Sequence, residues 1–186
     1  MLPPGLALVG IGPDALERLT TVSPGSHSFY LDLKRAVESA NKDDTPFTPA
    51  VSLIIALDEA VRMIEEIGLE AVWERHEVIA GGMRAGATAI GFTLLSESPA
   101  NSVTALFPPA GIAAKDVSDY LKRNYGFHLA GGQDHLKGKI IRVGHMGLAY
   151  GPEDAVRVSE ALEEAVVHLG GSAERGQARI AIEQSL

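Results

Sequence analysis

The chain of 186 residues contains no cysteine, which excludes disulfide bonds and metal sites built on thiolates. It has no cluster of lysine and arginine, and its net charge is −8, so the phosphate backbone of a nucleic acid is an unfavourable partner. It has no apolar run near the roughly 20 residues that a membrane-spanning helix requires. Residues 1–12 are too rich in proline and too poor in charge for a signal peptide. These absences predict a soluble cytoplasmic protein.

The chain does contain enough apolar material for a core, because 46% of its residues are hydrophobic and 22% are charged. The apolar run LALVGI at residues 6–11 is typical of a strand that is buried on both faces of a sheet. Few other strands are predicted near it. We therefore expect the sequence to begin inside a larger fold.

Helical patterns dominate the part of the chain before residue 91. Thr48 is a good N-cap and Pro49 fits the first helical position, and apolar residues then recur at helical spacing. Gly68 interrupts this pattern, and a further helix follows it. The predicted helices cover residues 12–22, 29–42, 48–67 and 70–90.

Residues 91–170 predict the order strand, strand, helix, strand, strand, helix. Gly126 is a plausible C-cap for the first of these helices, and Pro152 opens the second. This order is typical of a small α+β unit with its helices on one face of a largely antiparallel sheet. Residues 171–186 follow as a tail for which no element is predicted.

The stretch TPFTP places two hydroxyls, Thr45 and Thr48, at the start of a predicted helix. A helix N-terminus presents free N–H groups and the positive end of the helix dipole, which favour phosphate or carboxylate. Thr48 also fits a plain structural role as the cap of its own helix, and such caps are common. The residues alone favour the cap.

Arg142 stands in the middle of the predicted strand KIIRVG. Its neighbours Ile141 and Val143 point to the opposite face of the sheet. An arginine in this position emerges into solvent, pairs with an acidic side chain, or binds the carboxylate of a ligand through two parallel hydrogen bonds. The pattern leaves these alternatives open.

Other groups offer no catalytic site. The histidines His128, His135 and His145 match no zinc spacing and are interpreted as structural or surface residues. The six lysines lie in polar stretches, where nothing lowers the pKa of an amine for Schiff-base chemistry. The residues thus predict an anion-binding helix start and a placed arginine, without a catalytic group or a metal.

Several stretches, taken in order, resemble the class V aminotransferases. They are PPGLALVGI, SFYLDLK, TPFTPAVSLIIALDEA, WERHE, LAGGQDHLKGKIIRVGHMG and the helix that ends near residue 170. The nearest group is similar to the alanine–glyoxylate and serine–pyruvate aminotransferases, some bacterial members of which are labelled as a soluble hydrogenase subunit. The resemblance implies the C-terminal part of a fold-type I, α/β to α+β transferase that depends on pyridoxal phosphate and acts as a dimer.

The resemblance also implies roles for three residues. Arg142 matches the arginine of the family pattern R-x-G-x-x-G, which binds the substrate α-carboxylate. Thr48 matches the threonine of Y-x-x-T, which contacts the cofactor phosphate of the neighbouring subunit. Thr45 stands where that pattern has tyrosine. The implied reaction moves an amino group from serine or alanine to glyoxylate or pyruvate.

The Schiff-base lysine of the family precedes the PPGLA segment, and no lysine of this chain matches it. The resemblance therefore implies a chain that is inactive alone, either as a truncated enzyme or as a half that complements a separate N-terminal half. The alternative is a non-enzymatic module that binds a small metabolite or a protein. The implied domains are a remnant of the large domain (1–47), connecting helices (48–90), a small domain (91–170) and the tail (171–186).

Overall fold

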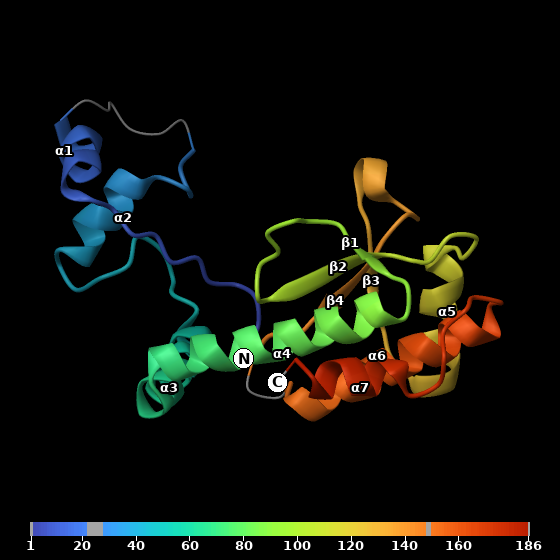
Figure 1. The fold of residues 1–186 in the computed structure, drawn as a ribbon. Coiled ribbons are helices and arrows are strands. Elements are labelled where there is room, and N and C mark those ends of the chain that lie inside the picture. Colours follow the sequence, from blue (N-terminus) through green and yellow to red (C-terminus); the bar gives the residue numbers. More distant parts are fainter. Residues whose placement is uncertain (1, 22–27, 148–149, 186) are drawn as a thin grey trace. The chain divides into compact units, whose positions relative to one another are not determined.

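The computed structural model describes residues 2–21, 28–147 and 150–185 (Figure 1). The chain separates into two compact units, Met1–Met63 and Ile64–Leu186. The division falls within helix α3 (Val51–Ile67). No helix in the described ranges is both long and apolar enough to cross a membrane.

The first unit is helical, with α1 (Pro13–Thr21), α2 (Leu33–Ala40) and the beginning of α3. Asp32 caps α2, because its carboxylate accepts hydrogen bonds from the backbone N–H groups of Lys34 at 2.9 Å and Arg35 at 3.3 Å. These helices lie within the ranges that the sequence predicts.

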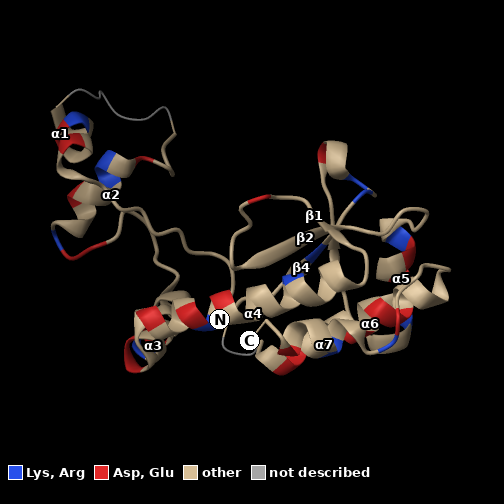
Figure 2. Ribbon diagram, viewed as in Figure 1, with Lys and Arg blue, Asp and Glu red and all other residues tan. Residues whose placement is uncertain are grey.

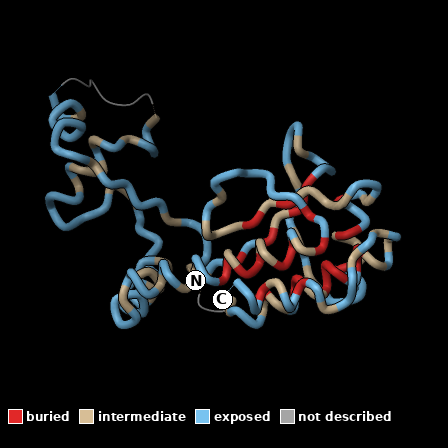
Figure 3. Tube along the Cα trace, viewed as in Figure 1, coloured by how far each residue is buried: buried red, intermediate tan, exposed pale blue. Residues whose placement is uncertain are grey.

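The first unit has no buried core among its described residues (Figure 3). Three aromatic rings contact one another on its surface: the ring of Phe47 stacks on Tyr30 with centroids 4.8 Å apart and lies 5.3 Å from the ring of Phe29. Large apolar side chains remain open to solvent, and Leu8 is 80% exposed and Leu31 73% exposed.

The strand predicted at residues 6–11 is not formed, and these residues have no regular secondary structure. A strand exists only through hydrogen bonds with a neighbouring strand. The described sheet lies entirely in the second unit, so the LALVGI segment has no partner strand in its own unit. The prediction of a strand at these residues is therefore wrong for this structure, because an apolar pattern does not supply the partner.

Helix α3 begins at Val51, which is later than predicted, and Thr48 therefore does not occupy the N-cap. The Val51 N–H bonds to the Pro49 carbonyl at 3.0 Å, an i to i+2 turn that keeps Pro49 and Ala50 out of the helix. The Ala50 carbonyl accepts the first helical hydrogen bond, from Ile54 at 3.0 Å. The prediction of a Thr48 cap is thus wrong.

The second unit contains a four-stranded antiparallel sheet in the order β1-β2-β4-β3. Its strands are β1 (Thr93–Leu94), β2 (Val103–Phe107), β3 (Ala130–Gly131) and β4 (Ile141–Gly144). A short 3-10 helix, η1 (Asp134–Leu136), lies between β3 and β4. The predicted small α+β unit is confirmed.

The helices of this unit lie on one side of the sheet (Figure 1). They are α4 (Leu69–Ala89), α5 (Ala114–Tyr125), α6 (Pro152–His168) and α7 (Gln177–Glu183). Gly126 ends α5 in the left-handed conformation with φ 70°, as predicted. The core joins the inner side of the sheet to the helices through Ile79, Met83, Leu106, Leu121, Ile141, Val143 and Leu162.

The segment expected as a tail contains α7, which packs on α4 and α6 and buries Ala178 and Ile182. Its docking depends on Glu163 of α6, a carboxylate that is only 3% exposed. Glu163 accepts hydrogen bonds from the backbone N–H groups of Gly176 at 2.6 Å and Ala178 at 2.8 Å. The sequence did not predict α7, because the helix is short and the carboxylate that accepts hydrogen bonds from its first N–H groups lies on α6.

Replacing Glu163 with glutamine should lower the free energy of unfolding by about 1.5–3 kcal/mol, because the amide can accept for only one of the two N–H groups. The matched control is Glu160→Gln on the same helix, which removes an exposed ion pair to Arg179 and should cost less than about 1 kcal/mol. Urea denaturation measures both. Equal losses of unfolding free energy in the two variants would show that the Glu163 hydrogen bonds do not hold α7 in place.

His145 is fully buried directly after β4, where its Nε2 lies 2.8 Å from the hydroxyl of Thr104. Burial lowers the pKa of His145, and the positive charge of Arg84 lowers it further. The unfolded chain therefore takes up a proton near pH 6.5 that the folded chain resists. Stability gained from this histidine is complete above that pH and is lost as the pH falls below it.

We expect the free energy of unfolding to fall between pH 7 and pH 5.5 by up to about 1.4 kcal/mol per pH unit from this group. In His145→Gln this part of the pH dependence should disappear, whatever the variant's stability at neutral pH. His128→Gln, at an exposed position, controls for the loss of a histidine. Denaturant titrations at several pH values give the slopes, and an unchanged slope in His145→Gln would disprove the assignment.

Candidate functional site

Arg142 lies on the open face of the sheet. Its neighbours in β4, Ile141 and Val143, are buried against the helices, so alternation places Arg142 on the other side. The residues directly opposite it in the sheet are Ala105 of β2 and Ala130 of β3. Small neighbours on both sides leave the long side chain room to reach away from the backbone.

The Arg142 side chain is held by one backbone contact, in which its Nε donates to the Gly131 carbonyl at 2.9 Å. No carboxylate in the described part of the chain lies within 4.0 Å of its nitrogens. Of the three alternatives for this arginine, pairing with an acidic side chain is therefore excluded within those residues. The terminal nitrogens remain available for an anion.

Arg142 lines a depression of about 520 Å³ together with residues from the end of α5, from β3 and from the start of α6. Its walls include Phe127, Leu129, Tyr150 and Asp154. Burial raises the pKa of Tyr150 to about 12, and the charge of Asp154 acts in the same direction. A cation beside a mainly apolar wall suits a small molecule that carries one carboxylate.

Thr45 and Thr48 belong to the first unit, whereas Arg142 belongs to the second. Both threonines are exposed. The Thr45 hydroxyl donates to the Phe47 carbonyl at 2.7 Å, and its N–H donates to Asp44 at 2.8 Å. Local hydrogen bonds therefore shape this turn, and the stacked ring of Phe47 anchors it.

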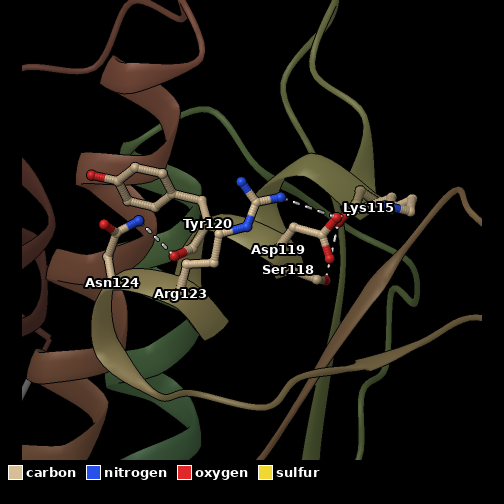
Figure 4. A network of polar contacts seen from close by, with 7 residues as sticks. Lys115, Ser118, Asp119, Tyr120, Arg123 and Asn124 are labelled. Atoms are coloured by element: carbon tan, nitrogen blue, oxygen red, sulfur yellow. Dashed lines mark hydrogen bonds and ion pairs between the residues drawn. The ribbon is translucent and has the colours of Figure 1, made fainter.

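No lysine of the chain is placed for Schiff-base chemistry, because none of the six is buried. Lys115 shows the opposite trend: the hydrogen bond to Asp119 at 2.5 Å, and the charge of that carboxylate, raise its pKa. Figure 4 shows this surface network on α5, in which Arg123 also approaches Asp119.

The described residues contain no group of three or more His, Asp or Glu side chains that could hold a metal. Figure 2 shows Lys and Arg interspersed with Asp and Glu along α5 and α6. His145 is a structural residue, as predicted, because it is buried beside Thr104.

Contacts between distant residues were beyond prediction. Arg75 of α4 donates to the Tyr150 carbonyl at 2.9 Å, and Nε2 of His76 accepts from the Gly147 N–H at 3.2 Å. Both contacts fix the chain that follows Arg142 to α4. The partners are more than 70 positions apart, so no local pattern in the sequence could predict these contacts.

The family model described as "Aminotransferase class-V" matches residues 1–162 of the chain. The small subunit of a soluble hydrogenase from Synechococcus sp. is 39% identical over 171 residues, which are 91% of this chain and 44% of that protein. The L-aspartate–glyoxylate aminotransferase of Paracoccus denitrificans is 35% identical over 151 residues. The match covers 79% of this chain and 37% of that protein.

Among solved structures, ureidoglycine–glyoxylate aminotransferase from Bacillus subtilis superposes with a TM-score of 0.76 at 31% identity. The match covers 86% of this chain and 42% of that structure. The chain thus spans less than half the length of the relatives it matches. It has the fold of their C-terminal portion, and it belongs to the class V aminotransferase family.

Proposed function

We propose that this chain supplies the substrate-carboxylate site of a class V aminotransferase, with Arg142 as the group that binds the carboxylate. The observation that carries the proposal is the guanidinium on the open face of the sheet, which has a backbone contact and no acidic partner among the described residues. Arginine matches a carboxylate in a planar, two-point arrangement. Aspartate, alanine and glyoxylate, which appear in the names of the relatives, all carry this group.

The proposed reaction in the complete enzyme is amino transfer from serine or alanine to glyoxylate or pyruvate. Arg142 binds and orients the amino acid or the 2-oxo acid, so that one end of a small substrate is fixed. A bidentate ion pair of this kind fixes the direction of the ligand as well as its position.

The proposed contact with the cofactor comes from the first unit. Thr48, with Thr45 beside it, contacts the phosphate of pyridoxal phosphate bound to a neighbouring subunit, near the positive end of the α3 dipole. The division into a large-domain part (1–47), connecting helices (48–90) and a small domain (91–170) belongs to the same proposal.

The chain by itself is proposed to be inactive, because it holds no buried lysine that could form a Schiff base. Activity then requires a surface that carries the missing group, either in a homodimer of the whole enzyme or in a complementing N-terminal half.

Replacing Arg142 with alanine should weaken the binding of pyruvate by at least about tenfold, because it removes a charge-assisted pair worth about 1.5–3 kcal/mol. The measurement is a titration of the isotope-labelled chain with pyruvate, followed by NMR. Arg123→Ala removes a cation whose side chain is 78% exposed and should bind as the wild type does.

Pyruvamide, which is neutral and similar in shape, should not bind detectably to the wild-type chain. Equal binding of pyruvate to wild type and Arg142→Ala would exclude Arg142 as the carboxylate site. Saturable binding of pyruvamide would show that the site does not recognise charge.

Borohydride reduction of the chain with pyridoxal phosphate should give no stoichiometric adduct on any single lysine, because all six amines lack a desolvated environment. Mass spectrometry of peptides locates any label, and a full-length alanine–glyoxylate aminotransferase serves as the positive control. One lysine labelled to completion would overturn the proposed inactivity. Co-expression with an N-terminal half should restore transamination for wild type, and not for Arg142→Ala.

A further inference from the structure

The direction of the Arg142 side chain is set by a hydrogen bond to a neighbouring strand. Its Nε donates to the Gly131 carbonyl at 2.9 Å. A guanidinium has five N–H donors, and this contact uses the one nearest the backbone. This contact leaves the two terminal nitrogens, which can meet both oxygens of a carboxylate.

The Gly131 carbonyl is held in a short strand. Strand β3 consists of Ala130 and Gly131 alone, and it pairs with Arg142 and Ile141 of β4. Two residues offer few hydrogen bonds of their own, so the position of this carbonyl depends on the connection that follows, residues 132–140. That connection includes the helix η1.

Gly132 allows this connection to close. A Cβ at this position would lie 2.6 Å from the carbonyl carbon of Leu136 and 2.9 Å from Cγ1 of Ile140, which are shorter than real Cβ contacts. The Leu136 atoms belong to the backbone, and Ile140 is only 2% exposed, so neither neighbour can move aside easily. A side chain here must displace the backbone next to Gly131.

Gly131 itself is different. A Cβ on Gly131 would lie 4.0 Å from its nearest neighbour, the Ile140 carbonyl oxygen, which is ordinary van der Waals contact. The two adjacent glycines therefore have different roles. Gly131 provides the carbonyl, and Gly132 provides the space that the following residues need in order to pack beside it.

We propose that Gly132 is a positioning residue for Arg142. It acts through the backbone: its missing side chain lets residues 132–140 pack closely, this packing holds the Gly131 carbonyl, and the carbonyl orients the guanidinium. The carboxylate part of this inference rests on the proposed function, whereas the orientation of Arg142 does not. An oriented side chain binds more tightly because less conformational freedom is lost on binding.

The test compares wild type, Gly132→Ala and the matched control Gly131→Ala. NMR detects the Nε–H of each arginine, and the Arg142 signal is assigned by its absence in Arg142→Lys. We expect this proton to exchange with solvent at least about tenfold more slowly than that of the exposed Arg123 in wild type and Gly131→Ala. In Gly132→Ala the protection should disappear. Protection that persists in Gly132→Ala, or is missing in wild type, would overturn the proposal.

Titration with pyruvate separates the positioning role of Gly132 from the proposed binding of a carboxylate by Arg142. If both hold, Gly132→Ala binds pyruvate about threefold to tenfold more weakly than the wild type does. If wild type binds no pyruvate but Gly132→Ala still loses the protection, the positioning is supported and the proposed function fails. Wild-type affinity in Gly132→Ala would exclude a role in carboxylate binding.

Folding of the variants is checked by backbone amide spectra, because Gly132→Ala disturbs a packed turn. If that variant does not fold, the wild-type chain still tests the step on which the proposal depends, the orientation of Arg142 by the Gly131 carbonyl. Slow exchange of the Arg142 Nε–H together with unchanged protection in Gly131→Ala supports the orientation by the carbonyl. Exchange as fast as that of Arg123 contradicts it.

Discussion

The antiparallel pairing of β2 with β4 is the constraint on which the rest of the second unit depends. In this register Ile141 and Val143 point into the core and Arg142 points out. A shift by one residue would bury the guanidinium and expose both apolar side chains. A buried unpaired charge costs several kcal/mol, so the register, the core and the place of the arginine are selected together.

The two units differ in how much of their apolar surface is covered. In the second unit α4, α6 and α7 complete a core over the inner side of the sheet. In the first unit no described residue is buried, and Ile55 of α3 is 66% exposed. Many large apolar side chains exposed on one unit are typical of a surface that contacts another part of a protein.

Arg142 and the lysines of this chain differ in their surroundings. Arg142 is positioned by the sheet and by the Gly131 carbonyl, and it needs no other part of the enzyme to keep its direction. The lysines, in contrast, are all outside the core. This contrast supports the proposal that the chain contributes a carboxylate-binding arginine and not the Schiff-base lysine.

The sequence by itself determined the elements whose signals are local. Helix α5 and its Gly126 cap, the strand around Arg142 and the α+β order of the second unit follow from spacing and from turn residues. The family was also readable, because its motifs occur in order along the chain. Among the local signals, the Thr48 cap failed, since the turn between Pro49 and Val51 competes with it.

Only the tertiary structure decided what depends on distant partners. The segment at residues 6–11 lacks a strand to pair with, α7 is held by a carboxylate of α6, and the Arg142 guanidinium is directed by a carbonyl of β3. Each outcome depends on a hydrogen-bonding group supplied, or not supplied, by a residue far along the chain. Periodicity and caps describe a segment's own preference, and the geometry of its neighbours decides whether that preference is realised.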